Sequence, residues 1–272
     1  MFTSIHPYSG IAHITDNMGV SFTLIEGSDH ALLFDTGYGL EDVRSYVRTL
    51  TDKPVRVFLS HGHHDHILGA RWFSDSFLCS QDMVEFLERS GTFQRSKVKQ
   101  QAEEKKIPVP DDFMEAQICL PDPICFTGKT GCFESITEDL GNLEVLIVRV
   151  PGHTPGSIVI YIPAHRLLLT GDDWNPCTWM WFPSSLSAVT WRNNMADLLI
   201  TLKSITGESV STVLCSHQPA VRKGSELTAF LEYMTADRMN QAEPVDMGST
   251  IHTYAVRKEP EDWTLIFDKD KI

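Results

Sequence analysis

Two segments of the chain show the same order of hydrophobic patterns. Residues 19–27 and 29–37 are β-rich runs divided by the turn sequence GSD, which predicts a hairpin. Apolar residues at helical spacing follow over 40–50, and after Pro54 the run VRVFLS predicts a buried strand over 55–60. This strand ends directly at His61.

The same order recurs between residues 141 and 218. LEVLIVRV (143–150) predicts a strand that ends at PGHTPGS, and residues 157–173 predict two strands around a turn at 163–165. Helical spacing over 190–205 and the apolar run 211–216 complete the series, and this last strand ends at His217. The recurrence predicts an α/β architecture in which two sheets pack together, with helices outside and active groups on loops at one rim.

The remaining residues interrupt or extend this pattern. Residues 80–135 contain two helical stretches, 81–90 and 96–106, among Pro- and Gly-rich turns, and predict an insertion that could act as a lid. The tail, 236–272, is polar until WTLIFD (263–268), which predicts a closing edge strand. We therefore expect one domain over 1–272 with an insertion at about 80–135 and a C-terminal extension at about 236–272.

Composition narrows the classes of function. The 272 residues are 42% hydrophobic, which allows a large core, and the net charge of −13 disfavours nucleic-acid binding, which needs a basic face. There is no basic leader followed by an apolar run, and no apolar stretch of the ~20 residues that span a bilayer. We expect a cytoplasmic protein that acts on a small molecule, with no membrane partner. Its six cysteines form no C-x-x-C pair, and without a signal peptide we expect them to be free thiols in a reducing cytoplasm.

The sequence LSHGHHDHILGA (59–70) holds four of the eleven histidines and an aspartate. At the end of an extended strand His61 and His63 point the same way, whereas His64 points away. As the chain turns, Asp65 and His66 can face back toward the same space. Imidazole nitrogens suit zinc, and a carboxylate can complete a second ion or share the first.

A metal ion rarely takes all its ligands from one loop. Three further candidates follow apolar strands beside small or turn-forming residues: His153 in PGHTPGS, Asp172 in TGDD and His217 in CSHQ. Any one of them alone is more often a hydrogen-bonded structural residue. The whole series in this order is hard to explain without a metal.

With these residues the chain resembles the metallo-β-lactamase-fold hydrolase superfamily, which includes glyoxalase II and the N-acyl-homoserine lactonases. The matching motifs lie within about 10–220: FDTG at 34–37, SHGHHDH at 60–66, PGHTPGS at 151–157, TGD at 170–172 and SH at 216–217. The resemblance implies a four-layer αβ/βα sandwich of two mixed β-sheets packed face to face, with a dinuclear site at its rim.

The resemblance also implies roles for individual residues. His61, His63 and His153 would hold one metal, Asp65, His66 and His217 the other, and Asp172 would bridge them. Asp35 would support the ligand loop from behind. Two Zn²⁺ ions are expected, with iron, manganese or mixed metals as alternatives.

In this interpretation a hydroxide that bridges the metals attacks an ester, thioester or lactone carbonyl, while Asp65 steers the proton. The alternatives are a mononuclear iron persulfide dioxygenase, a phosphodiesterase of the same fold and a metal-binding module without activity. Asp172 disfavours β-lactamase activity, because the commonest di-zinc β-lactamases carry cysteine at the corresponding place.

An aromatic segment directly follows Asp172. Residues 174–186, WNPCTWMWFPSSL, contain Trp174, Trp179, Trp181 and Phe182. They could form a wall of an apolar substrate pocket, or they could be a packed loop or a contact in a homodimer.

Overall fold

The computed structural model describes all residues from 1 to 272, and the chain forms two compact units. Unit 1 comprises residues 1–125, 137–145 and 216–220. Unit 2 comprises residues 126–136, 146–215 and 221–272. Both units are discontinuous in sequence. Unit 1 combines one mixed sheet with helices and unit 2 combines two mixed sheets with helices, so the predicted α/β class is confirmed.

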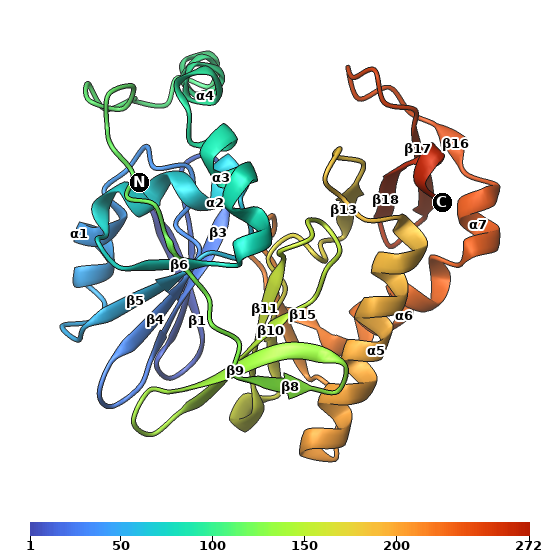
Figure 1. Ribbon diagram of the computed structural model, residues 1–272, viewed down its shortest axis with the longest axis horizontal. Helices are drawn as coiled ribbons and strands as arrows, with labels where there is room; N and C mark the ends of the chain where they lie inside the picture. The colour runs from blue at the N-terminus through green and yellow to red at the C-terminus, as the bar shows by residue number, and fades with distance from the viewer. The chain divides into compact units, whose positions relative to one another are not determined.

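Unit 1 contains a seven-stranded sheet in which neighbouring strands are also consecutive in sequence (Figure 1). Pairing is antiparallel from β1 to β4 and parallel from β4 to β7. The predicted hairpin is β3–β4, and the predicted strand before His61 is β5. The strands are β1 (Thr3–Tyr8), β2 (Ile11–Thr15), β3 (Ser21–Glu26), β4 (Ala31–Phe34), β5 (Val55–Phe58), β6 (Ser76–Leu78) and β7 (Asp122–Pro123).

Three of the four helices of unit 1 have seven residues or fewer, and the fourth has 13. Asp42 caps the first of them by accepting a hydrogen bond from the Ser45 backbone N–H at 2.9 Å, as the preference for Asp at helix starts predicts. The second begins at His64, so the histidine motif leaves its extended conformation in the middle. The helices are α1 (Val43–Arg48), α2 (His64–Ile67), α3 (Met83–Arg89) and α4 (Thr92–Glu104), with 3₁₀ turns η1 (Leu68–Trp72) and η2 (Ser80–Asp82).

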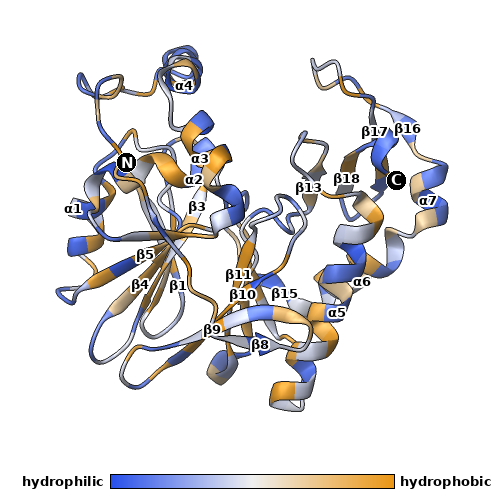
Figure 2. Ribbon diagram, viewed as in Figure 1, coloured by the Kyte–Doolittle hydropathy of each residue, from blue (hydrophilic) through white to orange (hydrophobic).

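A second seven-stranded sheet has the order β15-β14-β12-β11-β10-β9-β8 and lies mostly in unit 2, with only the end of β9 and the start of β10 in unit 1. Its central strands are uniformly buried and appear hydrophobic in Figure 2, as expected for strands covered on both faces. The strands are β8 (Gly128–Thr130), β9 (Phe133–Asp139), β10 (Glu144–Arg149), β11 (Ile158–Ile162), β12 (Leu167–Leu169), β14 (Thr212–Leu214) and β15 (Arg222–Lys223). The turn predicted at 163–165 is the 3₁₀ turn η3 (Pro163–His165).

A third, four-stranded sheet in unit 2 has the order β13-β18-β17-β16, and its strands are β13 (Cys177–Met180), β16 (Glu243–Pro244), β17 (Thr253–Lys258) and β18 (Trp263–Asp268). The expectation that residues 263–268 close a sheet edge is wrong, because β18 lies between β13 and β17. Its partner β13 is parallel to it, with Trp179 opposite Ile266. Parallel pairing of segments so far apart in sequence leaves no local signal, which explains the error.

Three helices and a 3₁₀ turn complete unit 2: α5 (Ala188–Thr206), α6 (Gly224–Tyr233), α7 (Ala236–Asn240) and η4 (Lys269–Lys271). The predicted helix over 190–205 is α5, which lies beside α6 (Figure 1). Ser187 caps its start and Gly207, at φ 75°, ends it in the left-handed conformation. Trp191 on its buried face is fully buried in the core of this unit, together with Trp174.

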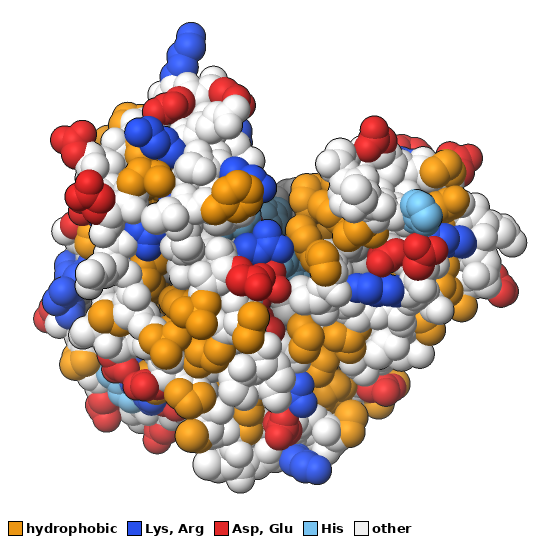
Figure 3. Space-filling view, turned by 45° about the horizontal axis from the view of Figure 1, so that its top comes forward, with side chains coloured by type: hydrophobic (Ala, Val, Ile, Leu, Met, Phe, Trp, Pro, Cys, Tyr) orange, Lys and Arg blue, Asp and Glu red, His pale blue; other side chains and the backbone are white.

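The described chain has no helix that combines the length and the apolar composition needed to cross a bilayer. Acidic and basic side chains are interspersed with hydrophobic ones on the face displayed in Figure 3. That face therefore offers no continuous basic strip.

Candidate metal centre

The histidine motif of unit 1 runs from the end of β5 into α2. Gly62, between the first two histidines, lies where a Cβ atom would be 2.9 Å from both the Asp82 carbonyl oxygen and the Phe86 backbone nitrogen. No larger residue fits at this distance, so glycine lets the motif pack against the start of α3. The Gly62 N–H also donates to an Asp82 carboxylate oxygen at 3.1 Å.

Three donor groups gather in unit 1. The Nε2 atoms of His66 and His217 lie 3.7 Å and 3.6 Å from the same carboxylate oxygen of Asp65. His217 reaches this position because the backbone N–H of Ser21 in β3 donates to the Ser216 carbonyl at 2.6 Å, which ties residues 216–220 to the first sheet. The structure thus brings Asp65 and His66, which are adjacent in sequence, together with the distant His217.

Asp35 lies directly behind His66. Its Oδ2 atom is 2.8 Å from His66 Nδ1, and its Oδ1 atom accepts a hydrogen bond from the Ser60 N–H at 2.6 Å. A carboxylate only accepts, so Nδ1 carries the proton and Nε2 keeps its lone pair. Asp35 is fully buried and adopts φ 68°, a conformation that costs most residues about 1–2 kcal/mol. Asp35 thus contacts both the backbone and a side chain of the histidine motif, and its role in supporting the ligand loop stays a prediction.

His61 and His63 also lie side by side in unit 1, with ring centroids 4.6 Å apart. One ring nitrogen of each histidine has a polar neighbour. His61 Nδ1 is 2.9 Å from Ser60 Oγ, and His63 Nε2 is 3.3 Å from Glu85 Oε1 on α3. The contact with His63 lowers the pKa of Glu85 to about 2, and Arg89 adds to the effect. Glu85 therefore holds the imidazole of His63 in one orientation.

His64 occupies a different environment, as its position in the motif predicts. Its ring packs edge-on against Tyr38, with centroids 5.5 Å apart, and burial lowers its pKa to about 4. It does not belong to the groups whose donor atoms gather.

Unit 2 contributes the other two predicted residues. His153 Nε2 lies 3.7 Å from an Asp172 carboxylate oxygen. His153 Nδ1 donates to the Trp179 carbonyl at 2.7 Å, and a carbonyl cannot donate in return. The proton is therefore fixed on Nδ1, and Nε2 keeps its lone pair, as in His66. The His153 backbone N–H is held at 2.8 Å by the Asp173 carboxylate.

The aromatic segment has one fully buried member and three that are at least partly exposed, of which Trp179 and Phe182 contact His153. Trp174 has no exposed surface and its ring packs edge-on against Phe230, so the interpretation of Trp174 as a pocket wall is wrong. Trp181 and Phe182 stack with centroids 4.6 Å apart, and Phe182 meets the His153 ring edge-on at 5.3 Å. Trp179 is 40% exposed.

The donor chemistry of these groups fits a divalent cation. Ligands about 2.0–2.2 Å from a tetrahedral zinc are about 3.3–3.6 Å from one another. The separations of 3.6 Å and 3.7 Å in unit 1, and of 3.7 Å in unit 2, are close to this spacing. Histidines whose remote nitrogen is fixed by a carboxylate or a carbonyl are typical of metal sites.

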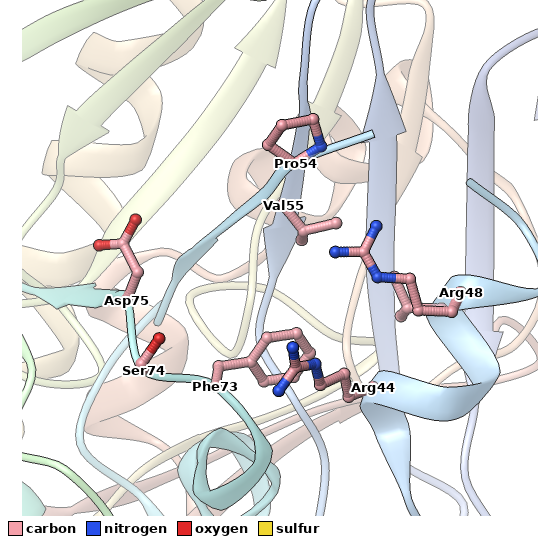
Figure 4. A pocket seen from close by; sticks show the side chains of 8 residues that line it. Arg44, Arg48, Pro54, Val55, Phe73, Ser74 and Asp75 are labelled. Carbon is pink, nitrogen blue, oxygen red and sulfur yellow. The ribbon is translucent and has the colours of Figure 1, made fainter. Parts of the chain in front are cut away.

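A hollow of about 220 Å³ in unit 1 lies apart from these residues. Figure 4 shows Arg44 and Arg48 beside Val55 and Phe73, and none of the predicted site residues lines it. The hollow therefore has no part in the candidate metal centre.

Sequence reasoning missed three supporting groups: Glu85, Asp173 and the Trp179 carbonyl. Asp173 was detectable as the second acid of TGDD. Glu85 lies on a helix of the predicted insertion with no spacing that marks it. A backbone carbonyl has no sequence signal.

Comparisons with known proteins agree with this description. The chain is 25% identical over 170 residues to the acyl-coenzyme A thioesterase MBLAC2 of Gallus gallus, over 56% of this chain and 60% of that protein. It is 27% identical over 150 residues to the probable metallo-hydrolase YybB of Bacillus subtilis (strain 168), over 54% of this chain and 59% of that protein. The chain thus spans about 60% of the length of these curated relatives.

Solved structures confirm the predicted fold. A metallo-beta-lactamase from Pontibacter korlensis superposes with a TM-score of 0.57 at 17% identity, over 85% of this chain and 98% of that one. The sec-alkylsulfatase Pisa1 from Pseudomonas sp. gives 0.63 at 18% identity, over 85% of this chain and 40% of that one. The sequence profile of the metallo-beta-lactamase superfamily matches residues 15–172, more than half of the chain. The chain therefore belongs to the metallo-beta-lactamase superfamily.

Proposed function

We propose that the protein is a metal-dependent hydrolase that cleaves a carboxylic thioester or ester, or a lactone. The observation that carries the proposal is the fixed orientation of His66 and His153, whose Nδ1 protons are held by the Asp35 carboxylate and the Trp179 carbonyl. Both histidines therefore present the lone pair that a metal requires. The thioesterase relative, similar over part of its length, supports the choice of bond.

The proposed ligands are the set assigned from the sequence. His61, His63 and His153 would hold one divalent cation, and Asp65, His66 and His217 a second, with Asp172 shared. The order of the motifs and the membership of the superfamily support this assignment. Zinc is the proposed metal, because the set contains five imidazoles and two carboxylates and no thiolate.

When bound, such cations lower the pKa of water and polarise a carbonyl oxygen. The chain itself orients the groups around the reacting atoms. Asp65 is proposed to accept and pass on a proton: one of its carboxylate oxygens lies 3.6 Å from His217 Nε2, and the other lies 3.8 Å from His64 Nδ1. No serine or cysteine is required as nucleophile, and burial raises the pKa of the nearby Cys215 thiol to about 12, which keeps it unreactive.

The apolar part of the substrate is proposed to lie on the aromatic residues beside His153. Trp179, Trp181 and Phe182 form one group of rings with centroids 4.6–6.2 Å apart. Because Trp179 and its neighbours are partly exposed, they offer an apolar surface to a ligand.

Metal analysis and a substrate panel test the proposal. Untagged protein purified without added metal is expected to contain close to two zinc ions per chain and to hydrolyse acyl-coenzyme A thioesters, aryl esters or lactones. The Asp172→Ala variant is expected to lose more than about 100-fold in kcat/KM, since even residues behind metal ligands are worth 10–100-fold. His252→Ala, at a histidine whose side chain is 73% exposed, is the control.

Three outcomes would overturn the proposal. One iron per chain together with oxygen uptake on a persulfide would identify a dioxygenase. Hydrolysis confined to phosphodiesters would identify the nuclease-like alternative. Full activity of Asp172→Ala would remove the proposed role of that carboxylate.

A further inference from the structure

The segment that orients His153 is itself held by a lysine from the other end of unit 2. The ammonium of Lys271, in η4, donates to the carbonyl oxygens of Phe182, Pro183 and Ser185 at 3.0, 2.7 and 3.0 Å. An ammonium has three N–H donors, so these three carbonyls use all of them. No carboxylate lies within ion-pair distance of Lys271 in the described chain.

Residues 179–185 contact His153 at three places. The Trp179 carbonyl accepts from the ring nitrogen Nδ1, and the Phe182 ring meets the imidazole edge-on. Ser185 Oγ donates to the His153 backbone carbonyl at 2.8 Å, and Ser185 is buried. Residues 179–185 therefore fix both the rotation of the imidazole and the position of its backbone.

The segment has two supports in unit 2. β13 is paired in parallel with β18, which holds residues 177–180. Beyond Met180 the strand ends, and residues 182–185 form a turn closed by the Ser185 N–H on the Phe182 carbonyl at 3.0 Å. Lys271 binds this turn, where the sheet no longer supports the chain.

We propose that Lys271 is a positioning residue for His153. The inference rests on the proposed role of His153 as a metal ligand. Lys271 touches neither the imidazole nor any reacting group, and acts through the turn at 182–185. Without its ammonium, the carbonyls of Pro183 and Ser185 lose this donor and that of Phe182 keeps only the Ser185 N–H, so the turn relaxes. Ser185 Oγ and the Phe182 ring then no longer fix His153 against the Trp179 carbonyl, and the imidazole is no longer held in one tautomer and one orientation.

Lys271→Met, which keeps most of the side-chain length and removes the charge, is the test variant. Lys271→Arg is the conservative variant, since a guanidinium can again donate to several carbonyls. Lys269→Met is the matched control: Lys269 lies in the same 3₁₀ turn and its ammonium also binds two carbonyls, those of Met239 and Asn240 on α7. A general effect of loosening η4, the 3₁₀ turn that holds both lysines, would appear in both methionine variants.

Two readouts do not require activity. The first is the rate at which a chelator removes zinc from the loaded protein. It is expected to rise about tenfold or more in Lys271→Met, to stay within threefold of the parent in Lys269→Met, and to recover in Lys271→Arg. The second is ¹⁵N NMR of the histidines in metal-free protein at pH 8, with His153→Gln for assignment. The parent is expected to show His153 protonated at Nδ1 alone, and Lys271→Met a mixture of tautomers.

Unchanged tautomer and zinc release in Lys271→Met would overturn the inference, and so would equal effects in Lys269→Met. If the parent hydrolyses no ester, thioester or lactone, the proposed function fails, while the tautomer of His153 still decides the role of Lys271. If the parent is active and Lys271→Met behaves like it in both readouts, the inference fails and the proposed function stands.

Discussion

Replacing Asp35 by asparagine should weaken metal binding while leaving the fold intact. The substitution keeps the shape of the side chain and one oxygen, which can still accept from the Ser60 N–H. In the parent the other oxygen lies 2.8 Å from His66 Nδ1. In the variant an NH₂ group takes its place and faces the same nitrogen. Two N–H groups cannot face each other, so the imidazole must either lose this hydrogen bond or move its proton to Nε2, the atom that binds metal.

The size of the effect follows from the bond that is lost. A hydrogen bond to a charged group contributes about 1.5–3 kcal/mol. At about 1.4 kcal/mol per tenfold change in affinity, its loss corresponds to roughly a 10- to 100-fold weaker site. Asp35 is fully buried, so solvent does not screen the interaction.

Competition with a chromophoric chelator measures the affinity, and urea unfolding of the metal-free protein measures stability. Asp16→Asn is the matched control: Asp16 is also buried, and its carboxylate accepts only backbone N–H groups, among them Tyr38 N–H at 3.0 Å. It should lose stability and keep its metal affinity. If Asp35→Asn binds zinc within threefold of the parent, or if Asp16→Asn loses as much affinity, the reasoning from the His66 tautomer is refuted.

Four further predictions concern individual side chains. Under native conditions at pH 8 a disulfide reagent should modify Cys119, Cys125 and Cys132 quickly, Cys177 more slowly because burial raises its pKa, and Cys79 and Cys215 only after unfolding, because both are buried and the pKa of Cys215 is raised to about 12; six fast thiols would contradict this. Trp181→Ala should raise KM for long-chain acyl thioesters about tenfold, because its ring offers apolar surface of the kind worth about 1.5–3 kcal/mol, and an unchanged KM across chain lengths would make the ring structural. Trp174→Ala should instead cost about 3–5 kcal/mol in urea unfolding, as a core cavity does, and a loss under 1 kcal/mol would contradict its burial. Burial lowers the pKa of His13 below 6.5, so the unfolded chain takes up the proton first and stability should fall as the pH drops below 6.5; His13→Gln should flatten this acid-side slope, and an unaltered slope would assign it to other groups.

The elements that sequence patterns predict well are those with local signals. The hairpin β3–β4, the strand before His61 and helix α5 were each marked by apolar periodicity or turn residues. The short helix that begins at His64 was not, because the motif HHDH carries no apolar period. The third sheet was missed because β13 and β18 lie more than eighty residues apart and pair in parallel.

The candidate ligands were predictable because each follows an apolar strand. The groups that orient them were mostly not, since orientation comes from contacts distant in sequence. Glu85 reaches His63 from α3, and the carbonyl that fixes His153 belongs to a tryptophan noted only for its ring. The error at Trp174 has the same origin: an aromatic run shows that rings are present, but alternation along β13 and the packing of Phe230 decide which of them are buried.

Unit 1 is built from segments that lie far apart in the sequence, and this affects the order in which the protein can be assembled during synthesis. His66 and Asp65 are synthesised early, but their neighbour His217 belongs to residues 216–220, which follow most of unit 2. A ribosome must therefore complete more than two thirds of the chain before these three groups can meet. A fragment that ends after residue 145 would contain the whole HGHHDH motif and still lack this neighbour. Dissecting the protein therefore requires adding residues 216–220 back to such a fragment, as a linked or separate peptide.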